Sequence, residues 1–181
     1  MTAYLDKLPR NRGLYYGGRW SPALSGLTEQ TINPATGESL GDYAVAAAAD
    51  VDAAVRAAHA GFKSWRAVKP AERAAIMREA ARIIRDHAEE IALIDSADSG
   101  GPFKRMIRDS EGGAQAFEFF AGLVTELKGA TIPFGDDNLN YTLREPLGVV
   151  VRINAFNHPF LFAASRAAAP LAAGNALIIK P

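Results

Sequence analysis

The sequence predicts an α/β protein that begins a parallel sheet, and three neighbouring segments carry this prediction. Residues 147–153, LGVVVRI, form an apolar run rich in β-branched residues, and residues 176–180, ALIIK, form a second one. Between them an alanine-rich helix is expected over about 159–173. A strand, a helix and a strand of these lengths make a βαβ unit with parallel strands and a right-handed crossover. Because parallel sheets need more strands and helices on both faces, we expect further polypeptide after Pro181.

Two turns and one helix start are recognisable in the first third of the chain. The pair Gly17-Gly18 lies between aromatic and apolar residues in LYYGGRW, residues 14–20, which predicts a β-hairpin because glycine adopts the positive φ angles of tight turns. Residues 32–38, INPATGE, combine Asn-Pro with Thr-Gly and predict a loop. Asp50 is expected to be the N-cap of the helix that follows.

Three helices are expected in the middle of the chain, because apolar residues recur there at a spacing of three and four. The first covers about 50–65, the second begins at a proline and covers about 70–94, and the third covers about 104–127. A pair of glycines, at 100 and 101, ends the region of the second helix. That helix is expected to bury one stripe of side chains: Ile76, Ala80, Ile83, Ile84, His87, Ile91 and Ile94.

The spacing changes to that of a strand near residue 140. Leu139, Tyr141 and Leu143 alternate with polar residues, which predicts a strand with one solvent-exposed polar face. We therefore divide the chain into three parts. They are a hairpin and helical part at 1–137, an extended strand at 138–146 and the βαβ unit at 147–181.

The composition is that of an ordinary globular protein, and it excludes several classes. Of the 181 residues, 20 are Lys or Arg and 20 are Asp or Glu, so the formal net charge is zero. Such a chain lacks the excess of basic residues that neutralises phosphates, so nucleic acid is not an expected partner. The N-terminus lacks the apolar core of a signal peptide, and the longest apolar stretch, 167–179, is shorter than a membrane span. We expect a soluble protein without a membrane partner, most simply a cytoplasmic one.

Residue types that carry metal or thiol chemistry are scarce. The sequence has no cysteine, which excludes disulfides, thiolate zinc sites and a cysteine nucleophile on this chain. His59, His87 and His158 are far apart and no HExxH motif occurs, so no metal site is expected. The first two histidines fall on helical stripes and are expected to be partly buried. Neither GxGxxG nor GxxxxGK[ST] is present, so a glycine-rich phosphate loop is not expected.

Chemistry is expected where the two parallel strands end, because ligands of open α/β sheets bind outside the carboxyl ends of the strands. The loop 154–159 follows the first strand and Lys180 closes the second, so both fall on one edge of the sheet, beside a helix N-terminus that favours negative charge. Asn157 can donate two hydrogen bonds without carrying charge, which suits an oxygen that becomes negative in a transition state. The alternative role of Asn157 is to cap the following helix. Lys180 can hold a phosphate or a ribose hydroxyl, or it can reach into solvent. His158 can act as a base, but the sequence places no partner beside it.

The stretch 144–181, REPLGVVVRINAFNHPFLFAASRAAAPLAAGNALIIKP, resembles the aldehyde dehydrogenase superfamily. The resemblance is carried by an E-P-x-G-V-V run, an aromatic-Asn-x-Pro turn, an alanine-rich helix that leads into A-G-N, and a strand that ends in Lys-Pro. It extends back through INPATGE and WRAVKPAERAAIMREAARII. The resemblance implies the N-terminal part of that fold: helices, a β-hairpin, an extended strand of the oligomerisation type, and the first βαβ unit of a Rossmann-like sheet.

The resemblance also implies an activity, the oxidation of an aldehyde to a carboxylic acid with NAD or NADP. In that family a cysteine attacks the aldehyde carbon to give a thiohemiacetal, and an asparagine amide and a backbone N–H hold its oxyanion. Asn157 matches that asparagine, and Lys180 matches the lysine that contacts the adenosine ribose of the cofactor. The residues that match the strand-end segment lining the cofactor site are Ile153, Asn154, Ala155 and Phe156.

The sequence departs from the family in having no cysteine. We therefore expect the truncated N-terminal part of such an enzyme, inactive without its C-terminal catalytic part and, as in the family, assembled as a homo-oligomer. Two alternatives remain open. One is a non-catalytic cofactor-binding or assembly module, and the other is a subunit completed by a separate chain, with LNYTLRE as the contact strand. The sequence indicates neither the aldehyde nor which of the two cofactors is used.

Overall fold

A short parallel ribbon of two strands is the centre of the fold. In the computed structural model, which describes residues 4–181, β7 (Val149–Ile153) pairs in parallel with β8 (Ala176–Lys180). The helix α5 (Pro159–Ala172) connects the two strands. The predicted α/β fold, with its βαβ unit in this part of the chain, is confirmed.

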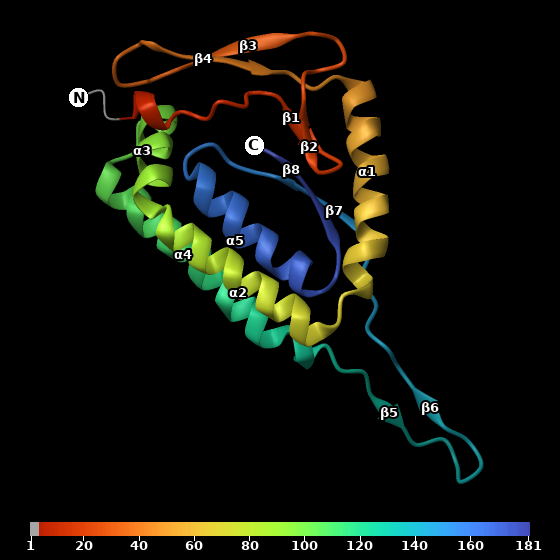
Figure 1. Cartoon of the computed structure of the whole chain (residues 1–181). Coiled ribbons are helices and arrows are strands. Elements are labelled where there is room, and N and C mark those ends of the chain that lie inside the picture. Colours follow the sequence, from red (N-terminus) through yellow and green to blue (C-terminus); the bar gives the residue numbers. More distant parts are fainter. Residues whose placement is uncertain (1–3) are drawn as a thin grey trace.

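Helices lie on both sides of this ribbon. The helix α1 (Ala48–Ala67) contacts both strands from one side, and α5 contacts them from the other (Figure 1). The remaining helices are α2 (Pro70–Asp86), α3 (Ala88–Ser99) and α4 (Phe103–Leu123). Helix α4 packs along α5, α2 packs along α4, and α3 contacts both α4 and α5. The N-terminus of α5 is therefore surrounded by α3 and α4.

The core between these helices is made mostly of alanines, with one methionine and one valine. Its buried members are Ala74, Met77, Ala121, Val124, Ala168 and Ala172. Small side chains let the helix backbones come close to one another, and Gly113 shows how close: a Cβ at that position would lie 2.9 Å from the Cβ of Ala164. Phe117 and Phe120 close the core from the side.

The helical region differs from its prediction in two respects. The expected second helix is two helices, because the chain leaves helical geometry at His87, where φ is −106° and ψ is 12°. The expected buried stripe is also wrong in part, since Ile76 and Ile83 are each 46% exposed while Ala74 and Met77 are buried. The stripe followed the isoleucines, whereas the buried face of α2 is made of alanines and Met77.

Two hairpins precede the helices. In the first, β1 (Leu14–Tyr16) pairs with β2 (Arg19–Ser21), and both turn glycines have positive φ angles, as predicted. The second pairs β3 (Thr28–Ile32) with β4 (Ser39–Ala44) around the predicted loop, but the sequence indicated only the loop. A short helical turn, η1 (Leu5–Lys7), precedes both hairpins.

Asp50 was expected to be the N-cap of α1, but it is the third residue of that helix. The N-cap is Ala47, whose N–H donates to Asp50 at 3.0 Å. The second carboxylate oxygen of Asp50 accepts the N–H of Leu24 at 2.9 Å. The buried carboxylate therefore holds the start of α1 against the loop between the two hairpins.

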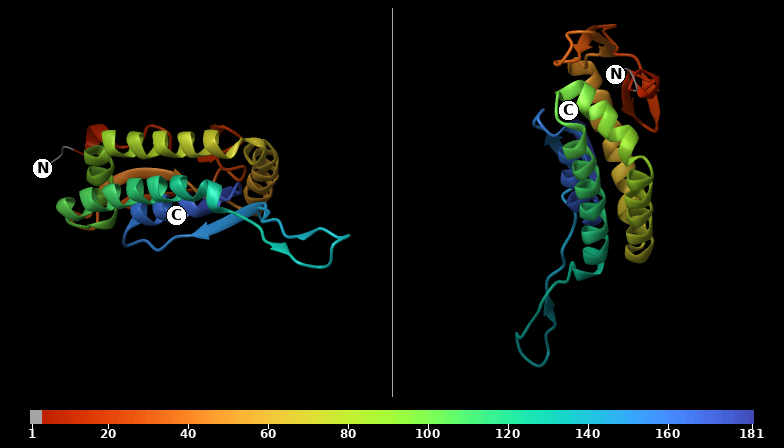
Figure 2. Two further views of the ribbon diagram at one scale, coloured as in Figure 1. Left: turned by 90° about the horizontal axis from the view of Figure 1, so that it is seen from below. Right: turned by 90° about the vertical axis from the view of Figure 1, so that its left-hand side faces the viewer.

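A narrow arm projects from the body of the molecule (Figures 1 and 2). After α4 and the turn η2 (Val124–Glu126), the strand β5 (Thr131–Ile132) pairs with β6 (Asn140–Tyr141). The predicted strand at 138–146 is thus only two residues long within a longer extended segment. Its apolar side is exposed, since Leu139 is 76% and Leu143 is 71% exposed.

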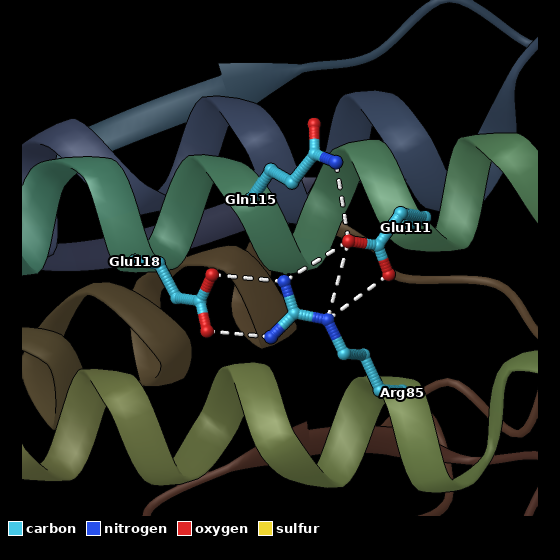
Figure 3. A network of polar contacts seen from close by, with 4 residues as sticks. All are labelled: Arg85, Glu111, Gln115 and Glu118. Carbon is cyan, nitrogen blue, oxygen red and sulfur yellow. Dashed lines mark hydrogen bonds and ion pairs between the residues drawn. The ribbon is translucent and has the colours of Figure 1, made fainter.

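An ion-pair network joins α2 to α4. The guanidinium of Arg85 donates to Glu111 and Glu118, and Gln115 donates to Glu111 at 3.1 Å (Figure 3). Hydrogen bonds from Arg85 hold the pKa of both glutamates below the usual range.

Among the described residues, no helix is long and apolar enough to cross a membrane.

Candidate functional site

The ends of the two parallel strands lie side by side. Ile153 is opposite Lys180 in the register, and the N–H of Asn154 donates to the Lys180 carbonyl at 3.0 Å. This hydrogen bond continues the ladder one residue beyond the last residue of β7. The predicted convergence of the two strand ends on one edge is therefore confirmed.

Most side chains at this edge are exposed. Ile153 is 75% and Phe156 is 87% exposed, and Ala155 and Lys180 are exposed as well. Asn154 differs from them, because its Nδ2 atom is buried and has no hydrogen-bond partner among residues 4–181. A buried amide donor without an acceptor is rare in folded proteins. An acceptor atom of a ligand could therefore form the hydrogen bond that this donor lacks.

Asn157 lies one residue before the N-cap of α5. That N-cap is His158, and no side chain caps the helix from this position. Asn157 is exposed, and no hydrogen bond of its carboxamide to another residue is found among residues 4–181. The alternative interpretation of Asn157 as a helix cap is therefore wrong, and both of its N–H groups are available.

The N-terminus of α5 is already occupied by a carboxylate. Asp95 on α3 accepts the N–H of Phe160, in the first turn of α5, at 3.1 Å. Burial raises the pKa of Asp95 to about 6, against the opposing effect of this hydrogen bond. The helix N-terminus therefore attracts a bound anion less strongly than the sequence indicates, because a carboxylate of the protein already interacts with the helix dipole.

His158 has two partners on α4 that sequence reasoning missed. Its Nδ1 lies 2.5 Å from Asp109 and its Nε2 lies 2.5 Å from Arg105. The side chains of His158 and Asp109 are only 13% and 10% exposed. No signal in the sequence points to these partners, because about 50 residues separate them from His158.

The other two histidines, His59 and His87, are exposed rather than partly buried, contrary to expectation.

The strand ends form an open edge rather than an enclosed pocket. Two hollows on the described surface lie away from this edge, one on the arm around Tyr141 and one between the N-terminal hairpins around Arg12. Among residues 4–181 no group of three His, Asp or Glu side chains is placed to hold a metal ion. The edge thus presents amide donors, one ammonium and apolar side chains, a set suited to polar organic ligands rather than metals.

Comparisons with known proteins agree with this architecture. A profile described as the aldehyde dehydrogenase family matches residues 20–181. The curated protein aldehyde dehydrogenase tropH from Talaromyces stipitatus is 45% identical over 179 residues, which is 97% of this chain and 35% of that protein.

Solved structures of similar proteins superpose closely on this chain. A variant of an aldehyde dehydrogenase from Bacillus cereus has a TM-score of 0.94 at 34% identity, covering 100% of this chain and 38% of that one. PnpE, also solved from Pseudomonas, has a TM-score of 0.91 at 36% identity in its complex with nicotinamide adenine dinucleotide, covering 94% of this chain and 35% of that one. The chain spans about a third of the length of these relatives. It belongs to the aldehyde dehydrogenase family.

Proposed function

We propose that the chain is the cofactor-side part of an NAD(P)-dependent aldehyde dehydrogenase, which oxidises an aldehyde to a carboxylic acid. The observation that carries the proposal is the pairing of Ile153 with Lys180, because it brings the turn of Asn157 and the Lys180 ammonium to one edge of the ribbon. Membership of the family supports the activity, and the relative solved with NAD supports the class of cofactor.

The groups at this edge fit a dinucleotide. Lys180 offers an exposed ammonium for a ribose hydroxyl or a phosphate, and Asn154 offers a buried amide donor without a partner in the described chain. Together with Ile153, Ala155 and Phe156, these residues would hold the cofactor. When bound, NAD or NADP accepts the hydride that leaves the substrate.

Asn157 is the oxyanion donor in this proposal. An uncharged carboxamide interacts more strongly with a developing negative charge than with a neutral aldehyde oxygen, so it stabilises the transition state more than the substrate. The sulfur that attacks the aldehyde, with formation of a thiohemiacetal, must come from other polypeptide because this sequence has no cysteine. The chain alone is therefore proposed to be inactive.

A fusion protein tests the proposal directly. Residues 1–181 are joined to the part of the Talaromyces stipitatus relative that follows its matching region, and NAD- or NADP-dependent aldehyde oxidation is measured. We expect activity in the fusion. Asn157→Ala is expected to lower kcat by about 100- to 1,000-fold, the loss typical of removing one oxyanion donor. Lys180→Met is expected to raise the KM for the cofactor about tenfold, the loss of one charged hydrogen bond.

The matched control is Asn138→Ala, at an exposed asparagine of the arm whose side chain has no role in the proposal. This variant is expected to keep the activity of the fusion. An active fusion in which Asn157→Ala has no effect on kcat contradicts the role of Asn157. An inactive but folded fusion contradicts the proposed activity.

The second candidate function is a cofactor-binding module without catalysis, and the absence of cysteine favours it. The measurement is the unfolding temperature of the 181-residue chain in millimolar NAD or NADP. A rise without aldehyde oxidation in the fusion supports the binding module. The absence of any rise contradicts it, since a ligand that binds only the folded state stabilises that state.

A further inference from the structure

The imidazole of His158 lies between two side chains of α4. Asp109 contacts its Nδ1 and Arg105 contacts its Nε2, each at 2.5 Å. Because Arg105 and Asp109 are four residues apart, they lie one turn apart on the same face of α4. His158 directly follows Asn157 in the chain. The contacts of His158 therefore attach the turn that carries Asn157 to a long, packed helix.

These two contacts determine where the ring proton lies. A guanidinium has only donors, so the Nε2 atom facing Arg105 must accept and carry no proton. The proton of a neutral imidazole is then on Nδ1, which donates it to the carboxylate of Asp109. Both ring nitrogens are used, and neither is free to take a proton from a substrate. The geometry thus argues against His158 as the catalytic base.

The surroundings of His158 hold the same turn from other directions. Asp95 on α3 accepts the N–H of Phe160, two residues after His158. Phe162 on α5 packs edge-to-face against the imidazole, with ring centres 5.6 Å apart, and Arg166 lies over the ring of Phe162. The charged groups placed near the imidazole are thus Asp95 from α3 and Arg105 and Asp109 from α4.

We propose that His158 is a positioning residue for the oxyanion donor: as a neutral Nδ1–H imidazole bridging Asp109 and Arg105, it fixes the turn that presents Asn157. The inference rests on the proposed function of Asn157.

The first test reads the ring proton in the 181-residue chain and needs neither cofactor nor activity. Long-range proton–nitrogen NMR of chain labelled with ¹⁵N-histidine, at a pH where imidazoles are neutral, is expected to show a proton on Nδ1 of His158 and none on Nε2. His87 is the matched control, since it is exposed and its Nδ1 contacts only Glu90, at 3.0 Å. A proton on Nε2 of His158 at that pH overturns the proposal.

The second test measures positioning in the active fusion described above. His158→Phe keeps the ring but loses both polar contacts, and we expect kcat to fall about 10- to 100-fold, the effect of a misplaced group, with the KM for the cofactor nearly unchanged. His158→Asn keeps a donor toward Asp109 and is expected to recover part of kcat. His87→Phe is the control and should behave as the unchanged fusion.

A third variant tests the bridge without touching His158. Arg105→Met, at an exposed residue, removes the donor that faces Nε2 of the imidazole. We expect kcat of the fusion to fall while the KM for the cofactor stays nearly unchanged. An unchanged kcat overturns the proposal.

Failure of this proposal is distinguishable from failure of the proposed function. If the fusion is active and depends on Asn157 while His158→Phe keeps full kcat, only the positioning role is wrong. If the fusion is inactive, the ring proton in the 181-residue chain still decides the state of the bridge.

Discussion

The carboxyl group of Asp95 is the side chain whose charge is most affected by the fold around the strand ends. Burial, more than any other effect, raises its pKa from 3.8 to about 6. The folded chain therefore binds this proton more readily than the unfolded chain does. Where the folded state binds more protons, stability falls as pH rises, so the contribution of Asp95 is most favourable in acid and is lost between about pH 4 and 6.

Asp95→Asn tests this argument, because an amide oxygen can still accept the N–H of Phe160 while carrying no charge. We expect the variant to be more stable than the wild type at pH 7 and to lose this advantage toward pH 4. The free energy of unfolding from urea titrations at several pH values measures it. Asp52→Asn, at an exposed residue of α1, controls for the loss of one negative charge. A variant that is less stable than the wild type at pH 7 contradicts the prediction.

Some residues of the candidate site can be predicted from the sequence and others cannot. Asn157 and Lys180 are predictable because Asn157 lies in the turn after one strand of a local βαβ pattern and Lys180 ends the other, and parallel strands must end on one edge. Asp95 and Asp109 are not predictable, because they reach His158 and the first turn of α5 from helices 49 to 65 residues earlier in the chain. Their placement depends on how the helices pack, and spacing along one segment does not contain that information.

At the scale of elements, Arg73 joins the ends of two helices to a third. It lies on α2 and is 7% exposed, and its guanidinium donates to the carbonyls of Val68, after α1, and Ala172, at the end of α5, each at 3.0 Å. Carbonyls at helix ends lack partners within their own helix. Burial lowers the pKa of Arg73, so the side chain is held in the core at the expense of its hydration.

Arg73→Met keeps the apolar part of the side chain and removes these two hydrogen bonds together with a longer third one, to the carbonyl of Arg66 at 3.5 Å. We expect a loss of about 3 kcal/mol of unfolding free energy, because two buried carbonyls lose a charged donor. Arg82→Met is the control, at an exposed position on the same helix with partners Glu79 and Asp86, and should cost less than about 1 kcal/mol. Chemical denaturation of the three chains measures the difference. Equal losses in the two variants would show that Arg73 acts only as another surface charge.

Element boundaries were predictable where one residue type decides the backbone. The turn of the first hairpin follows from its two glycines, and α2 and α5 begin at prolines, as their sequences indicate. The break at His87 was not predictable, because the apolar spacing continues across it. The choice of face was wrong for Ile76 and Ile83 because it is decided by a neighbouring helix, which packs closely against alanines.

At the scale of the whole molecule, the chain exposes more surface than a compact protein of its mass. Its accessible surface is 11,691 Å², whereas scaling from the mass predicts about 8,500 Å². Much of the excess is on the arm and at the strand ends, where large apolar side chains are exposed. They are Phe134, Leu139, Tyr141, Leu143, Leu147, Ile153 and Phe156.

Association through the arm would explain why its apolar side chains are exposed. A two-stranded hairpin with an exposed apolar side is only marginally stable by itself, so we propose that the arm packs against a second copy of the chain. The chain is then expected to elute above its monomer mass of 19.3 kDa in size-exclusion chromatography with light scattering. The double variant Leu139→Ser with Leu143→Ser is expected to shift the mass toward the monomer while the helical circular dichroism stays unchanged.

A control pair of substitutions distinguishes association through the arm from unspecific association of exposed apolar side chains. Leu24 and Leu27 are also exposed, at 66% and 57%, but they lie in the loop between the N-terminal hairpins. If association depends on the arm, replacing these two by serine leaves the mass of the particle unchanged, because no extended strand presents them to a partner. If both pairs of substitutions lower the mass equally, association is unspecific burial of apolar surface. If neither does, association through the arm is contradicted.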